Sequence, residues 1–93
     1  MIRSWKSKEA EKIWHGVVSK KLPYDIQDVA RRKLRMLHNA CSLNDLRVPL
    51  GNHLESLKGR RMGQYSLRVN DQWRICFMWQ GANADDVEIV DYH

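Results

Sequence analysis

The chain has 93 residues, of which 43% are hydrophobic and 29% are charged, and its formal net charge is +5. This size and composition predict one globular domain spanning residues 1–93, and no apolar run approaches the roughly 18 residues of a membrane-spanning helix. The first nine residues are interspersed with charges and lack the apolar stretch of a secretory signal, so we expect a cytoplasmic protein. The positive charge favours an anionic partner, of which nucleic acid is the commonest in the cytosol.

Metal and thiol chemistry find little support in the sequence. Cys41 and Cys76 are far apart and match no ligand spacing, which is typical of two reduced cysteines in a cytosolic chain. The histidines are also scattered, at His15, His38, His53 and His93. We therefore expect neither a bound metal nor a cofactor.

Two helices are predicted in the first half of the chain. Ser7 is suited to cap the first, and the apolar residues that follow at helical spacing are Ala10, Ile13, Trp14, Val17 and Val18. Pro23 and Asp25 mark the start of the second helix, which is expected to end near Ala40.

Strands are predicted in the second half. Residues 42–52 contain Pro49 and Gly51 and indicate a connecting loop, with room for one helical turn at 43–46. Strands are expected at 53–57, 64–69, 73–79 and 87–92, and the basic segment 58–63 follows the first of them. The order of elements predicts an α+β fold, with two N-terminal helices packed on a mainly antiparallel sheet of four strands.

The alternation of apolar side chains sets the register of the central hairpin. The apolar rows match only if three pairs are opposed, namely Val69 and Trp73, Leu67 and Ile75, and Tyr65 and Phe77. This register places Arg68 directly across from Arg74, on the face turned away from the helices. The same rule applied to the last hairpin pairs Trp79 with Val87, Phe77 with Ile89, and Arg74 with Tyr92.

Two opposed arginines repel each other, so their pairing suggests an anion, such as phosphate, between the guanidinium groups. Both could instead extend separately into water, as most exposed arginines do. Lys58, Arg60 and Arg61 would add positive charge if their loop folds toward the same face, and the sequence leaves that direction open. Tyr92 and His93 are close to the proposed site, and histidine is the side chain that most readily exchanges a proton near neutral pH.

The chain resembles the HigB toxins of the RelE/ParE superfamily along nearly its whole length. The resemblance is carried by Leu57-Lys58-Gly59, by residues 63–75 (GQYSLRVNDQWRI) and by Val90-Asp91-Tyr92-His93. It implies a curved antiparallel sheet beneath two N-terminal helices, binding in the ribosomal A site and cleavage of the mRNA codon there. It also implies a HigA-like antitoxin with a helix-turn-helix.

Carried over by position, the resemblance implies a catalytic set with Asp91 as support: Lys58, Arg68, Arg74, Tyr92 and His93. Arg60 and Arg61 are expected to bind RNA. Some relatives have a histidine where this chain has Glu55, and others have glutamate, so Glu55 is left out of the set.

RNA carries its own nucleophile, the ribose 2′-hydroxyl, so the reaction requires proton transfer and charge stabilisation rather than a metal. We expect His93 or Tyr92 to move the proton, the arginines to stabilise the phosphate, and Lys58 to act as a base or as a second stabiliser. The alternative is a non-catalytic module, either ParE-like or a basic ribosome-binding protein. A dimerisation domain is a third possibility, but it does not explain why two arginines are opposed.

Overall fold

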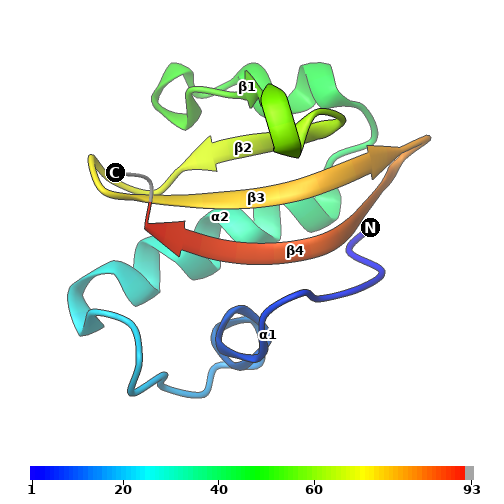
Figure 1. The fold of residues 1–93 in the computed structure, drawn as a ribbon. Coiled ribbons are helices and arrows are strands. Elements are labelled where there is room, and N and C mark those ends of the chain that lie inside the picture. Colours follow the sequence, from blue (N-terminus) through cyan, green and yellow to red (C-terminus); the bar gives the residue numbers. More distant parts are fainter. Residues whose placement is uncertain (92–93) are drawn as a thin grey trace.

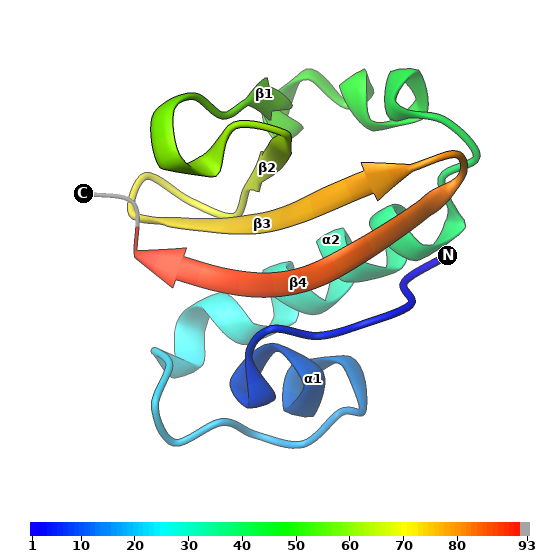
Figure 2. The ribbon, with the colours of Figure 1, turned by 45° about the vertical axis from the view of Figure 1, so that its right-hand side comes forward.

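The computed structural model describes residues 1–91, which form two α-helices and one four-stranded sheet (Figures 1 and 2). The helices are α1 (Lys8–Trp14) and α2 (Gln27–Asn39), and the strands are β1 (Glu55–Ser56), β2 (Gln64–Arg68), β3 (Trp73–Gln80) and β4 (Asn83–Asp91). Short 3-10 turns connect them: η1 (Tyr24–Ile26), η2 (Leu43–Arg47), η3 (Leu50–Asn52) and η4 (Gly59–Arg61). The strands are antiparallel in the order β1-β2-β3-β4, which confirms the predicted α+β class and four-stranded sheet.

Helix α1 begins as predicted but ends earlier. The hydroxyl of Ser7 accepts a hydrogen bond of 3.3 Å from the backbone N–H of Ala10, which caps the first turn. Gly16 then adopts a left-handed backbone with φ of 78°, which an α-helix cannot continue. Val17 and Val18, predicted to extend the buried stripe, are more than half exposed in the loop that follows, so that part of the prediction is wrong.

Helix α2 covers one face of the sheet and supplies much of the core. Its buried residues Ala30, Leu34 and Leu37 recur at helical spacing and belong to the same apolar cluster as the inward-facing side chains of the sheet. Figure 1 shows α2 crossing behind β3 and β4, with α1 beside β4. None of the helices within residues 1–91 has both the length and the apolar character needed to cross a membrane.

The register of the central hairpin is confirmed. Leu67 pairs with Ile75 and Tyr65 with Phe77, and the same alignment places Arg68 opposite Arg74. Leu67, Ile75 and Phe77 are fully buried, so a slip by one residue would expose an entire apolar row. The cost of that exposure is what fixes the alignment.

The register of the β3–β4 hairpin differs from the prediction. Strand β4 begins at Asn83 after a tight turn at Gly81, and Trp79 pairs with Ala84 rather than with Val87. A bulge between Cys76 and Met78 shifts the alignment once more, and Arg74 pairs with Val90 rather than with Tyr92. Asp86, in the bulged part of β4, takes a left-handed φ of 52°, so the strand absorbs one extra residue there.

The first six residues pair with the outer edge of β4. Parallel bridges join Ile2 to Ala84 and Trp5 to Val87, and the backbone N–H of Arg3 donates to the Ala84 carbonyl at 2.8 Å. The sequence did not predict this contact. A segment that is joined to a strand by only two isolated bridges shows no alternation of apolar and polar residues. It covers an edge that would otherwise leave its backbone groups without partners.

We expect position 86 to tolerate glycine far better than a branched residue, because glycine adopts a left-handed backbone without steric cost. The Asp86→Gly variant should keep its free energy of unfolding within about 0.5 kcal/mol of the parent, whereas Asp86→Val should lose about 1–2 kcal/mol. Urea denaturation of the three proteins measures both values. Equal losses in the two variants would show that the Asp86 carboxylate, and not the backbone, stabilises the bulge.

Candidate functional site

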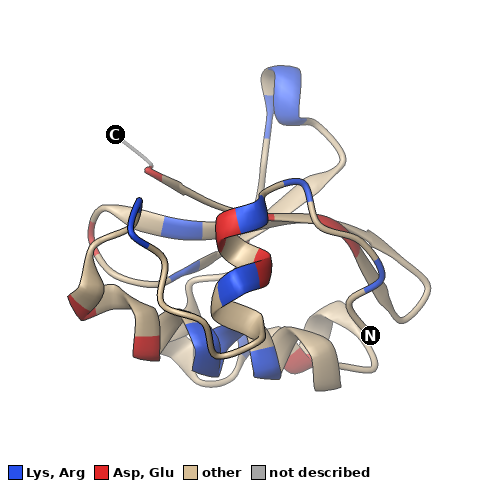
Figure 3. Cartoon of the chain, turned by 90° about the horizontal axis from the view of Figure 1, so that it is seen from below, with Lys and Arg blue, Asp and Glu red and all other residues tan. Residues whose placement is uncertain are grey.

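The predicted basic residues gather on the face of the sheet opposite α2. The chain leaves α2, passes through η2 and η3, forms β1 at the sheet edge and then turns through η4. In Figure 3 η4, coloured blue for its arginines, stands clear of the sheet on the side away from α2. The direction that the sequence left open is therefore settled, since the loop that follows Lys58 projects over this face.

Arg74 is the buried centre of this region. Its side chain lies on β3 and is 9% exposed. Its Nε donates to the hydroxyl of Ser66 at 2.8 Å, and its Nη2 donates to the carbonyl oxygens of His53 and Ser66. Its Nη1 is 3.7 Å from a carboxylate oxygen of Glu55. One guanidinium thus links β1, β2 and β3 to the segment before β1.

The predicted opposition of Arg68 and Arg74 holds for their backbones, but each side chain has its own partners. The Arg68 guanidinium pairs with the carboxylate of Asp71 in the β2–β3 turn, and both groups are reached by solvent. Arg74 is turned into the contacts described above. The expected anion bridge between two unpaired guanidinium groups is therefore not what the side chains show in this structure, where acidic partners already reduce the repulsion.

The charge of Arg68 also affects Lys33 on α2. Burial lowers the pKa of the Lys33 ammonium group, and the positive charges of Arg32 and Arg68 lower it further. The Lys33 ammonium group donates to the carboxamide oxygen of Asn52, a side chain with no exposed surface. The positive charge of Arg68 is thus felt as far as α2, where Lys33 is bound to η3 through Asn52.

Arg61 and Arg60 have different surroundings although both were predicted to bind RNA. The Nη1 of Arg61 lies 3.2 Å from the side-chain oxygen of Gln64 and 3.2 Å from a carboxylate oxygen of Glu88, so Arg61 fastens η4 to the sheet. Arg60 is exposed, as is Lys58 just before the turn. Lys58 and Arg60 are therefore the cations of this segment that are placed to meet a ligand.

The remaining predicted site residues, Tyr92 and His93, lie outside the described residues. Asp91, the last described residue, pairs with Trp73 across β4 and β3, and its carboxylate accepts a hydrogen bond of 2.9 Å from the side-chain amide of Gln72. Asp91 thus lies at the same end of the sheet as Arg74, which is one residue beyond Trp73 on β3.

Cys76 lies beside Arg74 on this face and is fully buried. Burial raises the pKa of its thiol, with a smaller opposing effect from Arg61, so the thiol stays protonated and is a poor nucleophile. Within residues 1–91 no three His, Cys, Asp or Glu side chains are grouped as metal ligands would be.

The sequence did not reveal three contributors to the Arg74 contacts: Ser66, Glu55 and the His53 carbonyl. Strand alternation does place Ser66 on the same face as Arg68, and pairing with Cys76 puts it next to Arg74. The His53 carbonyl has no signal in the sequence, because its direction follows from a left-handed backbone with φ of 42°.

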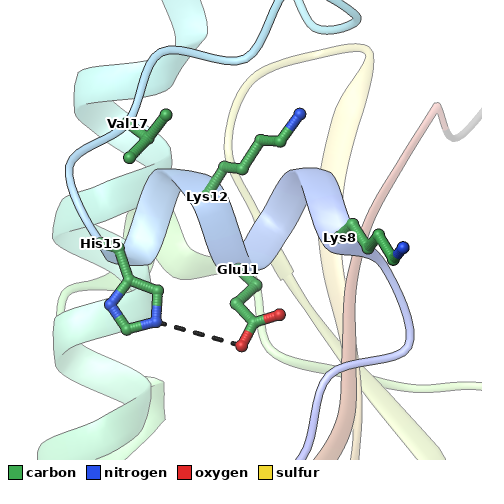
Figure 4. Close-up of a pocket in the computed structure, with 5 residues that line it drawn as sticks. All are labelled: Lys8, Glu11, Lys12, His15 and Val17. Carbon is green, nitrogen blue, oxygen red and sulfur yellow. Dashed lines mark ion pairs between the residues drawn. The ribbon is translucent and has the colours of Figure 1, made fainter.

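The surface of the described residues is hollowed near the Arg74 contacts and also on α1. The first hollow is lined by Arg47, Leu50, His53 and Leu54 and adjoins the Arg74 contacts through His53. The other lies on α1, where Figure 4 shows the side chains of Lys8, Glu11, Lys12, His15 and Val17. An ion pair of 4.0 Å joins His15 to Glu11 there, away from the arginines of the sheet.

Comparison with known proteins identifies the family of this chain. A family model for the RelE-like toxin of the HigB type II toxin–antitoxin system matches residues 3–93. Toxin HigB-1 of Vibrio cholerae is 43% identical over 58 residues, which span 62% of this chain and 61% of that protein. Endoribonuclease HigB of Proteus vulgaris is 29% identical over 93 residues and is matched over the full length of both chains.

A solved structure shares the fold at lower sequence identity. The crystal structure of YafQ from Escherichia coli superimposes with a TM-score of 0.66, covering 98% of this chain and 91% of that chain. The two sequences are 12% identical, so this likeness concerns the arrangement of helices and strands alone.

The surroundings of Arg68 and Arg74 predict very different losses of stability for the same substitution. Arg74→Gln should lower the free energy of unfolding by about 2–4 kcal/mol, because it leaves buried acceptors without a donor. Arg68→Gln should change it by less than about 0.5 kcal/mol, because the pair with exposed Asp71 contributes little. Thermal melts at low and high salt measure both effects. A large loss in the Arg68 variant would mean that its pair with Asp71 stabilises the hairpin.

Proposed function

Because this chain belongs to the family of RelE-like toxins of HigB type II toxin–antitoxin systems, we propose that it is an endoribonuclease that cuts messenger RNA on the ribosome. The observation that carries the proposal is the match of the family model to residues 3–93, together with the name of the Proteus vulgaris relative. The exposed cations beside the sheet support it, since a phosphate backbone is bound mainly by lysine and arginine.

The proposed reaction is an attack by the ribose 2′-oxygen on the adjacent phosphorus. A base on the protein takes the 2′-hydroxyl proton, the bond from phosphorus to the 5′-oxygen breaks, and an acid returns a proton to that oxygen. The products are a 2′,3′-cyclic phosphate and a 5′-hydroxyl. No external nucleophile is consumed, so the protein supplies alignment, proton transfer and stabilisation of negative charge.

We assign these roles to Lys58, Arg68 and Arg74 according to how exposed each side chain is. Lys58 and Arg68 have side chains that solvent reaches, so they are placed to contact the phosphate or, for Lys58, to accept the proton. Arg74 is mostly buried, and its proposed contribution is to stabilise charge from within the sheet while it fixes the β1 segment. Proton transfer is assigned to Tyr92 or His93, as the sequence resemblance implies.

Type II toxins have a protein antitoxin as partner, and we propose that it is a HigA-like protein with a helix-turn-helix. The ribosome is the second proposed partner. A protein with a Cα radius of gyration of 12.0 Å has little surface with which to align a flexible strand, and a ribosome that holds the message would supply that alignment.

We expect cleavage to require translating ribosomes. The purified protein should cut a message held in the A site at low concentration, and should leave the same message intact when it is free, because free RNA is not held in line for attack. Primer extension on the two samples measures the cut. Equal cutting of naked RNA would contradict ribosome dependence, and an absence of cutting in both samples would favour a binding module without catalysis.

Replacing one ribose by 2′-deoxyribose should stop the reaction, since the nucleophile is then missing. The substituted message carries the change only at the nucleotide before the scissile phosphate and is placed on the ribosome like the parent message. Cleavage should be lost while binding to the programmed ribosome stays nearly the same. Continued cutting at that bond would mean that water, and not the 2′-hydroxyl, attacks.

A further inference from the structure

The hollow next to the Arg74 contacts combines the side-chain types that recognise a nucleobase. Its volume is about 260 Å³, and the residues that line it are Arg47, Leu50, His53 and Leu54. An imidazole ring offers a flat surface on which a base can stack, and the leucines offer apolar contact. A guanidinium group presents two parallel N–H donors to the edge of a base.

The frame of this hollow is rigid. Asn52, which has no exposed surface, donates from Nδ2 to the carbonyl oxygens of Leu46 at 3.2 Å and Val48 at 3.5 Å. Its carboxamide oxygen accepts from Lys33 on α2. Asn52 therefore ties the segment that carries Arg47 to the segment that carries His53, and the hollow exists before any ligand arrives.

The hollow is also joined directly to the candidate catalytic surface. His53 takes a left-handed backbone with φ of 42° and ψ of 57°, which a non-glycine residue rarely adopts. Its carbonyl oxygen accepts from the Arg74 guanidinium, and the same residue lines the hollow. Strained backbones of this kind persist where the surroundings hold them, and here the buried arginine is the holding group.

Leu50 and Arg47 would contribute little to the fold by themselves. Leu50 is 86% exposed, and Arg47 is exposed at the end of η2. A single exposed leucine needs no explanation, but here it shares a preformed hollow with a planar cation and an imidazole ring. Their shared position, next to the contact that fixes Arg74, suggests a ligand that reaches the catalytic surface at the same time.

We propose that this hollow, lined by Arg47, Leu50, His53 and Leu54, is a subsite for a purine base of the RNA substrate, next to the scissile phosphate. The inference rests on the proposed function, because it assigns part of the same substrate. His53 stacks on the base, and Arg47 donates to its edge. Arginine has donors only, so the subsite favours guanine, whose O6 and N7 both accept, over adenine and the pyrimidines.

The test uses ribosomes programmed with messages that differ in one base at a time across the A-site codon. For the parent protein, the cleavage rate should be about tenfold higher with guanine than with a pyrimidine at one codon position. In the His53→Asn and Arg47→Lys variants this ratio should fall to about twofold or less. Asparagine tolerates the left-handed backbone of position 53, and lysine keeps the charge of position 47 while it loses the paired donors.

Matched controls are His15→Asn on α1 and Arg35→Lys on the exposed side of α2, which should keep the parent ratio. Thermal melts should show that all four variants fold like the parent. The proposal is overturned if the parent shows no preference for guanine at any position, or if the two subsite variants keep it. It is also overturned if they slow cleavage of every message by the same factor. If the parent cuts none of the messages, the proposed function itself fails.

Discussion

The guanidinium group of Arg74 joins the sheet to the segment that carries the other basic residues. It is held by the Ser66 hydroxyl, by two backbone carbonyl groups and by the Glu55 carboxylate, and it lies almost entirely out of solvent. A charge in such a position is stable only when its donors are satisfied, so the backbone of His53 must stay where it is. Fixing His53 also restricts where Lys58 can lie, because the short strand β1 connects these two residues.

Arg68 and Arg74 have different surroundings, although the strand pattern alone would make them equivalent. Arg68 and Arg74 are opposite each other on neighbouring strands, yet one is near solvent with Asp71 and the other is enclosed. A substitution of Arg74 changes the fold and the charge at once, whereas a substitution of Arg68 changes chiefly the charge. Loss of activity in a variant of Arg74 therefore gives information about catalysis only if the protein remains folded.

The sequence was sufficient for the features that depend on repeated patterns. The register of β2 and β3 could be predicted because both strands alternate cleanly, and the opposition of Arg68 and Arg74 followed from it. The start of α1 was also predictable, since Ser7 is a favourable cap. Features set by single backbone angles were not: the early end of α1 at Gly16, the bulge at Asp86 and the direction of the His53 carbonyl all depend on left-handed residues. The partners of Arg74 are equally beyond a strand pattern, because they come from segments that meet only in the folded chain.

The pairing of the first six residues with β4 affects the order in which the chain can be completed during synthesis. The backbone N–H of Asp86 donates to the hydroxyl of Ser4, 82 residues away, and β4 is also the outer partner of β3. Translation makes the first segment long before the second, so the first segment must wait for β4 to leave the ribosome. The sheet that carries Arg74 is thus complete only after β4 has been made and has left the ribosome. Loss of β4 would therefore leave one edge of β3 and the backbone groups of the first six residues without partners at the same time.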